Sequence, residues 1–259
     1  MDRQKLFDAV RSRPFGGRLT QQNVDGLTAI LDEWRALYPD GDVHHLANIL
    51  AQIYHETATR MVGIKETVMP HHTNTNPSDD EVIRRLDRAF ANGQLTWVRA
   101  PYWREGWFGR GHIQLTHRAN YEKMGKRLGV DLVGNPDLAL DNHVGARIAI
   151  VGMMEGLFTG RKLSDYTFPR ALNAGSGQHP RRIVNGHDGT DAKIAKLHRE
   201  FLDALQAAGY APGEPAPVPP PPDVEPAPND PEIPDGSRDA AAFWQALYEW
   251  LRKWFGRAS

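Results

Sequence analysis

The sequence predicts a mainly α-helical domain with at most a small β-hairpin, followed by a Pro-rich linker and a C-terminal amphipathic helix. Apolar residues recur at three- and four-residue spacing through most of the first 210 positions, and turn or capping residues separate these runs. Eleven of residues 212–234 are Pro, which builds neither helix nor sheet. The 259-residue chain is long enough for one large domain with an appendage. We therefore expect a domain at 1–210, a linker at 211–236 and a helix at 237–259.

Seven helices are expected in the domain, each with a recognisable start or stop. Thr20, Asp42 and Ser78 are suitable N-caps, because their side-chain oxygens can accept from free backbone N–H groups of the first turn. The aromatic segment 102–108 has no helical or strand period and is expected to form a loop or small hairpin. The expected helices cover residues 2–12, 20–37, 43–56, 78–91, 116–128, 141–160 and 190–208.

The helix at 43–56 places an acidic residue on its own apolar face. Its inward positions include Ile49 and Ile53, and Glu56 follows them at seven and three residues. Burial and the negative end of the helix dipole both raise the pKa of a carboxyl group. Glu56 is therefore a candidate general acid, with a partly exposed glutamate at a frayed helix end as the alternative.

Composition excludes several classes of function. The 31 basic and 32 acidic side chains leave a net charge of −1, which argues against a nucleic-acid binder that neutralises phosphates. The chain has no Cys, so a thiol nucleophile, a disulfide scaffold and a Cys-based zinc site are excluded. The N-terminus lacks the apolar stretch of a secretory signal and no run is long enough to span a membrane. We expect synthesis in the cytoplasm and action elsewhere only after release.

The segment at 237–259 predicts a short helix with one apolar face. It carries the apolar residues Phe243, Leu247, Trp250 and Trp254, and it is too short to cross a bilayer. Contact with a membrane or cell envelope is one interpretation, and folding back on the domain or self-association is the other.

Hydrolysis at an acetal centre requires a second carboxylate beside Glu56. Glu66 follows ten residues later, and Glu105 lies among the aromatic residues of segment 102–108. Spacing alone leaves both open.

The segment 108–116, FGRGHIQLT, has a pattern suited to a polar groove. Its glycines permit close backbone approach, and Gln114 and Thr116 alternate with apolar residues, so they share one face. The segment lacks the Gly-Lys-Ser/Thr ending of a phosphate-binding loop. Flat aromatic rings such as those of Trp103 and Trp107 suit a carbohydrate, although aromatic residues also pack in cores.

These motifs together resemble glycoside hydrolase family 19, which holds chitinases and many phage endolysins of lysozyme-like α-helical fold. The resemblance covers residues 20–205 and rests on an ordered set of motifs. The motifs are HET at 55–57, Glu66, GRGHIQLT at 109–116 followed by Asn120 and Tyr121, GVDLVGNPDLA at 129–139 and RIVNG at 182–186.

The resemblance implies an inverting hydrolysis with Glu56 as general acid and Glu66 as general base. Thr116 matches a residue that helps to hold the attacking water. The chain departs from the plant enzymes at Lys193, where they have an Arg that partners the base, and in residues 67–100, which do not align. The residues expected at the substrate groove are His55, Trp103, Gln114, Asn120, Tyr121, Asn185 and Lys193.

Peptidoglycan is the substrate preferred from the sequence, with chitin as the alternative, because a chain without an evident secretory signal or Cys resembles a phage or prophage lysis protein acting at the bacterial cell wall. A metal-dependent peptidase is disfavoured, since His55-Glu56 begins a zinc motif but Thr59 stands where the second His is needed. A non-catalytic glycan-binding protein is disfavoured because both carboxylates are present. No metal or other cofactor is expected.

Overall fold

The structure is a computed structural model that describes residues 1–211 apart from 70, 97 and 187. In this part of the chain, seven α-helices and one two-stranded antiparallel sheet confirm the mainly α prediction. The helices are α1 (Arg3–Ser12), α2 (Gln21–Leu37), α3 (Val43–Glu56), α4 (Asp79–Ala91), α5 (Arg118–Leu128), α6 (Asn142–Glu155) and α7 (Asp191–Ala207). The strands are β1 (Ile64–Lys65) and β2 (Arg110–Gly111).

The predicted caps form as expected. The side chains of Thr20, Asp42 and Ser78 each accept a hydrogen bond from a backbone N–H in the first turn of α2, α3 and α4. Two boundaries were predicted wrongly. The helix expected from residue 116 begins at Arg118, since His117 has a φ of 69° that is not helical. The helix expected to reach residue 160 ends at Glu155, because Gly156 takes the left-handed conformation.

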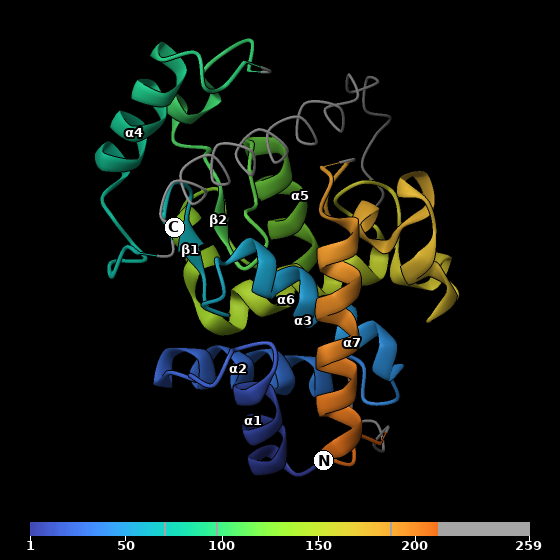
Figure 1. Cartoon of the computed structure of the whole chain (residues 1–259). Coiled ribbons are helices and arrows are strands. Elements are labelled where there is room, and N and C mark those ends of the chain that lie inside the picture. The colour runs from blue at the N-terminus through green and yellow to red at the C-terminus, as the bar shows by residue number, and fades with distance from the viewer. Residues whose placement is uncertain (70, 97, 187, 212–259) are drawn as a thin grey trace, which may run out of the picture.

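Helix α3 lies at the centre of the molecule (Figure 1). It packs along α7, while α2 packs along α6 (Figure 1). Its apolar residues Leu46, Ile49, Leu50 and Ile53 are fully buried. The core is made mainly by this group of helices, and α3 therefore presents its last residue, Glu56, from a rigid support.

A separate lobe, residues 78–108, stands to one side of this body. Figure 1 shows its helix α4 apart from the other helices, beyond the small β1–β2 sheet. The lobe has its own apolar cluster, formed by Val82, Leu86, Leu95, Trp103 and Phe108. We call residues 78–108 the α4 lobe.

Within the described residues, none of the helices is long and apolar enough to cross a membrane. The predicted linker after Ala211 and the predicted C-terminal helix at 237–259 lie outside the described residues.

Candidate active site

Glu56 ends α3 inside a buried charge cluster. Its Oε1 lies 2.6 Å from Nη1 of Arg181, and both side chains are fully buried. Arg181 also donates to Oδ2 of Asp188 from Nε at 2.9 Å and from Nη2 at 2.6 Å. Its Nη1 donates to Oε1 of Gln52 at 2.8 Å. One guanidinium is thus shared between two carboxylates and an amide, which a planar five-donor group is suited to do.

A polar stripe along α3 supports this cluster. His44, Asn48, Gln52 and Glu56 follow one another at four-residue spacing, so they share one face of the helix. Gln52 donates to the carbonyl of Pro180 at 3.2 Å, which holds the segment before Arg181 against α3. The four-residue spacing of this polar stripe is visible in the sequence beside the apolar face of α3, although it was not among the predicted features.

The charge cluster sets the protonation of Glu56. Burial raises the pKa of Glu56 above its ordinary value of 4.5, while the charge of Arg181 and its hydrogen bond oppose the rise. Burial and the charges of Arg181 and Lys193 lower the pKa of His55 well below 6.5. Burial, the dominant cause, and the charge of Arg181 also lower the pKa of Lys193, although Glu56 and Asp188 oppose this. Lys193 is therefore coupled electrostatically to Glu56, the predicted acid.

Glu66 lies in a second, separate network directly after β1. Its Oε2 accepts from the backbone N–H of Gly109 at 2.7 Å, and its Oε1 accepts from the hydroxyl of Tyr102 at 2.9 Å. The residue is only 2% exposed. Burial raises the pKa of Glu66 to about 7, with the bonds from Gly109 and Tyr102 and the charge of Arg110 acting against the rise.

Gln114, a predicted groove residue, and Thr116, predicted to help hold the attacking water, lie beside the backbone that binds Glu66. Gln114 donates through Nε2 to the carbonyls of Ile64 and Gly111, at 3.0 and 3.1 Å, and ties the two strands together. A Cβ on Gly109 would lie 2.9 Å from Oε1 of Gln114 and 3.3 Å from Oγ1 of Thr116. The absence of a side chain at 109 lets these two side chains approach the backbone closely. The hydroxyl of Thr116 is thereby held beside the donor of Glu66.

Asn120 and Asn185 stabilise the loops of the site from within. Asn120 donates through Nδ2 to the carbonyl of Thr116 at 2.8 Å. Asn185 is buried, donates to Asp188 at 3.3 Å and accepts from the N–H of Gly186. In the structure both residues contact the protein backbone or side chains that shape the loops.

Two residues predicted to line the groove lie in the interior. Trp103 is fully buried in the apolar cluster of the α4 lobe, and its Nε1 donates to Asp87 at 2.9 Å. Tyr121 is also fully buried, and its hydroxyl donates to the carbonyl of Phe108 at 2.9 Å. Both rings pack in apolar clusters, and aromatic character alone does not distinguish a core ring from a sugar platform. Glu105, the alternative second carboxylate, is exposed.

Arg181 and Tyr102 are the contacts of the two carboxylates that the sequence reading missed. Arg181 directly precedes the RIVNG motif and Tyr102 belongs to the aromatic segment, so both positions were close to features already noted. Among the described residues, no three His, Asp or Glu side chains gather in a group suited to a metal ion.

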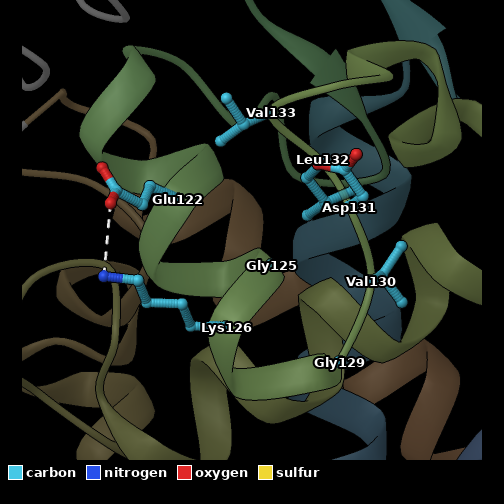
Figure 2. Close-up of a pocket in the computed structure, with 8 residues that line it drawn as sticks. All are labelled: Glu122, Gly125, Lys126, Gly129, Val130, Asp131, Leu132 and Val133. Carbon is cyan, nitrogen blue, oxygen red and sulfur yellow. Dashed lines mark ion pairs between the residues drawn. The ribbon is translucent and has the colours of Figure 1, made fainter.

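A surface pocket of about 310 Å³ lies elsewhere, between the C-terminal part of α5 and the loop that follows it. Figure 2 shows its lining, with the ion pair between Lys126 and Glu122 at 3.2 Å on one side. The lining residues are Glu122, Gly125, Lys126, Gly129, Val130, Asp131, Leu132 and Val133. None of the candidate site residues contributes to this pocket.

The chain is similar to chitinases. Residues 40–156 match the family model of glycoside hydrolase family 19, described as chitinase class I. Chitinase 8 of Oryza sativa subsp. japonica is 62% identical over 121 residues, which cover 40% of this chain and 46% of that protein. Endochitinase 2 of Solanum tuberosum is 49% identical over 135 residues, which cover 46% of this chain and 41% of that protein. The matches thus span less than half the length of these relatives.

Chitinase C of Streptomyces griseus HUT6037 is a similar solved structure. It is 22% identical, with a TM-score of 0.46, and the alignment covers 81% of this chain and 77% of that one. The matched segment 40–156 contains Glu56, Glu66, Gln114 and Thr116, in the order in which the sequence motifs place them. The family match and these relatives show that residues 40–156, a little less than half of the chain, are similar to glycoside hydrolase family 19, chitinase class I.

Proposed function

We propose that this protein hydrolyses the β-1,4 bonds of a chitin-type polysaccharide. The observation that carries the proposal is a pair of buried carboxyl groups, Glu56 and Glu66, whose pKa values are both raised by burial. Both lie in the segment that matches the family, whose relatives are named as chitinases. Two carboxyl groups in different environments are what glycoside hydrolysis requires.

In this mechanism Glu56 protonates the bridging oxygen and Glu66 removes a proton from the attacking water. The hydroxyl of Thr116, beside the Gly109 backbone that binds Glu66, helps to orient the water. Water attacks the face opposite the leaving group, so the configuration at the anomeric carbon inverts. Such a mechanism needs room for a water between the carboxyl groups, which inverting enzymes provide with a separation of roughly 6.5–9.5 Å.

Peptidoglycan, the substrate preferred from the sequence, is the second candidate. Its glycan also carries β-1,4-linked N-acetylated sugars, so the same two carboxyl groups would serve. The similar proteins reported above are named as chitinases, and nothing in those names points to peptidoglycan. Chitin is therefore the first choice of substrate. Action at a bacterial cell wall would require that peptidoglycan is the substrate instead.

The proposal is tested with purified protein on chitin oligosaccharides and on purified peptidoglycan. We expect soluble products from chitin, with the α-anomer formed first in proton NMR spectra. Glu56→Gln keeps the shape of the side chain but cannot donate the proton, so it is expected to lose about 1,000-fold or more in kcat. Full activity of this variant would overturn the role of Glu56. Release of products from peptidoglycan alone would overturn the choice of chitin.

A further inference from the structure

Tyr102 reaches Glu66 from a part of the molecule outside the main helical body. It lies in η1 (Tyr102–Glu105) of the α4 lobe, 36 residues after Glu66 in the sequence, and its hydroxyl donates to Oε1 at 2.9 Å. The N–H of Gly109 donates to the other oxygen at 2.7 Å. Each carboxylate oxygen therefore has its own donor, and two donors on opposite oxygens fix the rotation of the carboxylate plane.

The orientation of Tyr102 is set by packing within and next to the lobe. Its ring meets that of Trp103 edge to face, at 5.1 Å and 80°, and Trp103 is anchored by its bond to Asp87. On another side the ring lies 4.7 Å from that of His117. Such aromatic contacts prefer defined angles, so the position of the hydroxyl follows the position of the lobe.

An ion-pair network attaches the lobe to the sheet that carries Glu66. Asp79, at the start of α4, lies 2.6 Å from Nζ of Lys65 and 2.9 Å from Nη2 of Arg110. Asp137 contacts the same two cations, at 3.0 and 2.8 Å. Both cationic side chains are almost fully buried, at 4% and 1% exposure. Charged pairs of this kind fix geometry, since removing one partner leaves an uncompensated charge.

The network acts on both sides of the carboxylate at once. Lys65 directly precedes Glu66 in the sequence, and Arg110 directly follows Gly109. Asp79, in the first turn of α4, therefore binds the two residues next to Glu66 and Gly109, which are the carboxylate and its backbone donor. A displacement of the lobe would change the distance from Tyr102 to Glu66.

We propose that Tyr102 is a positioning residue for Glu66, and that the α4 lobe, fastened through Asp79, holds it in place. The inference rests on the hydrolysis proposed above for the role of Glu66 as base. Tyr102 donates its hydroxyl proton to the ionised carboxylate and takes no part in bond breaking. The Tyr102 hydroxyl occupies one lone pair of Oε1, so the carboxylate of Glu66 faces the attacking water in a single orientation.

The test compares Tyr102→Phe with the wild type in two measurements. The variant removes one oxygen and keeps the ring that packs against Trp103 and His117. The hydrogen bond from Tyr102 stabilises the ionised form of Glu66, so we expect the acidic limb of kcat/KM to move up by about one pH unit in the variant. We also expect kcat to fall about tenfold at neutral pH, with KM changed less than twofold. Tyr54→Phe, which removes a hydroxyl bound to the Pro14 carbonyl, is the matched control and is expected to leave the profile unchanged.

The second measurement does not depend on activity. The carboxyl carbon of Glu66 is titrated by NMR in protein labelled at glutamate, with Glu66→Gln identifying its signal. We expect the midpoint to move up in Tyr102→Phe and by a smaller amount in Asp79→Asn. An unchanged midpoint in Tyr102→Phe would overturn the positioning role, and an unchanged midpoint in Asp79→Asn would overturn the fastening role of the lobe. A protein that titrates as expected but hydrolyses neither polysaccharide would refute the proposed function and leave the contact intact.

Discussion

Replacing Glu66 by Gln tests whether burial raises the pKa of this carboxyl group and makes its ionised form costly in the folded protein. In the folded protein the pKa of Glu66 rises from 4.5 to about 7. Each tenfold change in proton affinity corresponds to about 1.4 kcal/mol, so ionising Glu66 in place costs about 3 kcal/mol more than in the unfolded chain. Since the side chain is 2% exposed, solvent screening reduces this figure little.

The sign of the effect follows from proton binding. Between pH 4.5 and about 7 the folded chain holds the proton of Glu66 while the unfolded chain releases it. This contribution to the free energy of unfolding is present below pH 4.5 and is lost as pH rises to about 7. Glu66→Gln has no such loss. We expect the stability of the variant relative to the wild type to increase by about 3 kcal/mol between pH 4 and pH 8, while its activity is abolished.

Urea unfolding followed by tryptophan fluorescence, repeated across this pH range, measures the difference. The amide of Gln meets two hydrogen-bond donors and makes one bond fewer, but this cost does not depend on pH and cancels in the comparison. Glu105→Gln is the control, because Glu105 is exposed and its replacement is expected to give a flat difference. A flat difference for Glu66→Gln as well would refute the inference that Glu66 is held protonated by burial.

Three further results are expected. The kcat/KM of the wild type should fall as pH drops below about 7, since Glu66 must be ionised to act as base; an acidic limb near the ordinary glutamate value would contradict this. Arg181→Met should lower the free energy of unfolding by about 3–5 kcal/mol, because Glu56 and Asp188 would remain buried without their cation. Urea unfolding at pH 7 measures the loss. A change below about 1 kcal/mol would show that the two carboxylates do not depend on Arg181 for their burial. Burial, above all, and the neighbouring histidines lower the pKa of His198 to about 3. Its contribution to the free energy of unfolding is therefore present above pH 6.5 and is lost as pH falls, by about 2 kcal/mol at pH 5. Unfolding curves of His198→Phe should lack this part of the acid sensitivity, and equal acid sensitivity in the variant and the wild type would contradict the lowered pKa.

The sequence by itself determined the helices and their caps, and it singled out Glu56 as a carboxyl group on an apolar helix face. Helix positions follow from local spacing, and the caps at Thr20, Asp42 and Ser78 follow from hydrogen bonds within one turn. The burial of Glu56 was also readable, because a residue in register with Ile49 and Ile53 must face the same core. These features depend on neighbours within a few positions of the chain.

Only the tertiary structure decided what surrounds the carboxylates. Arg181 reaches Glu56 across 125 positions and Tyr102 reaches Glu66 across 36, and no local pattern encodes such a pairing. The same limit applies to Trp103 and Tyr121, which are fully buried, since an aromatic side chain gives the same sequence signal in a core as in a groove. Local spacing fixes which face of an element a residue occupies, but the charge, the hydrogen-bond donors and the solvent it meets there depend on which distant segments fold against that face.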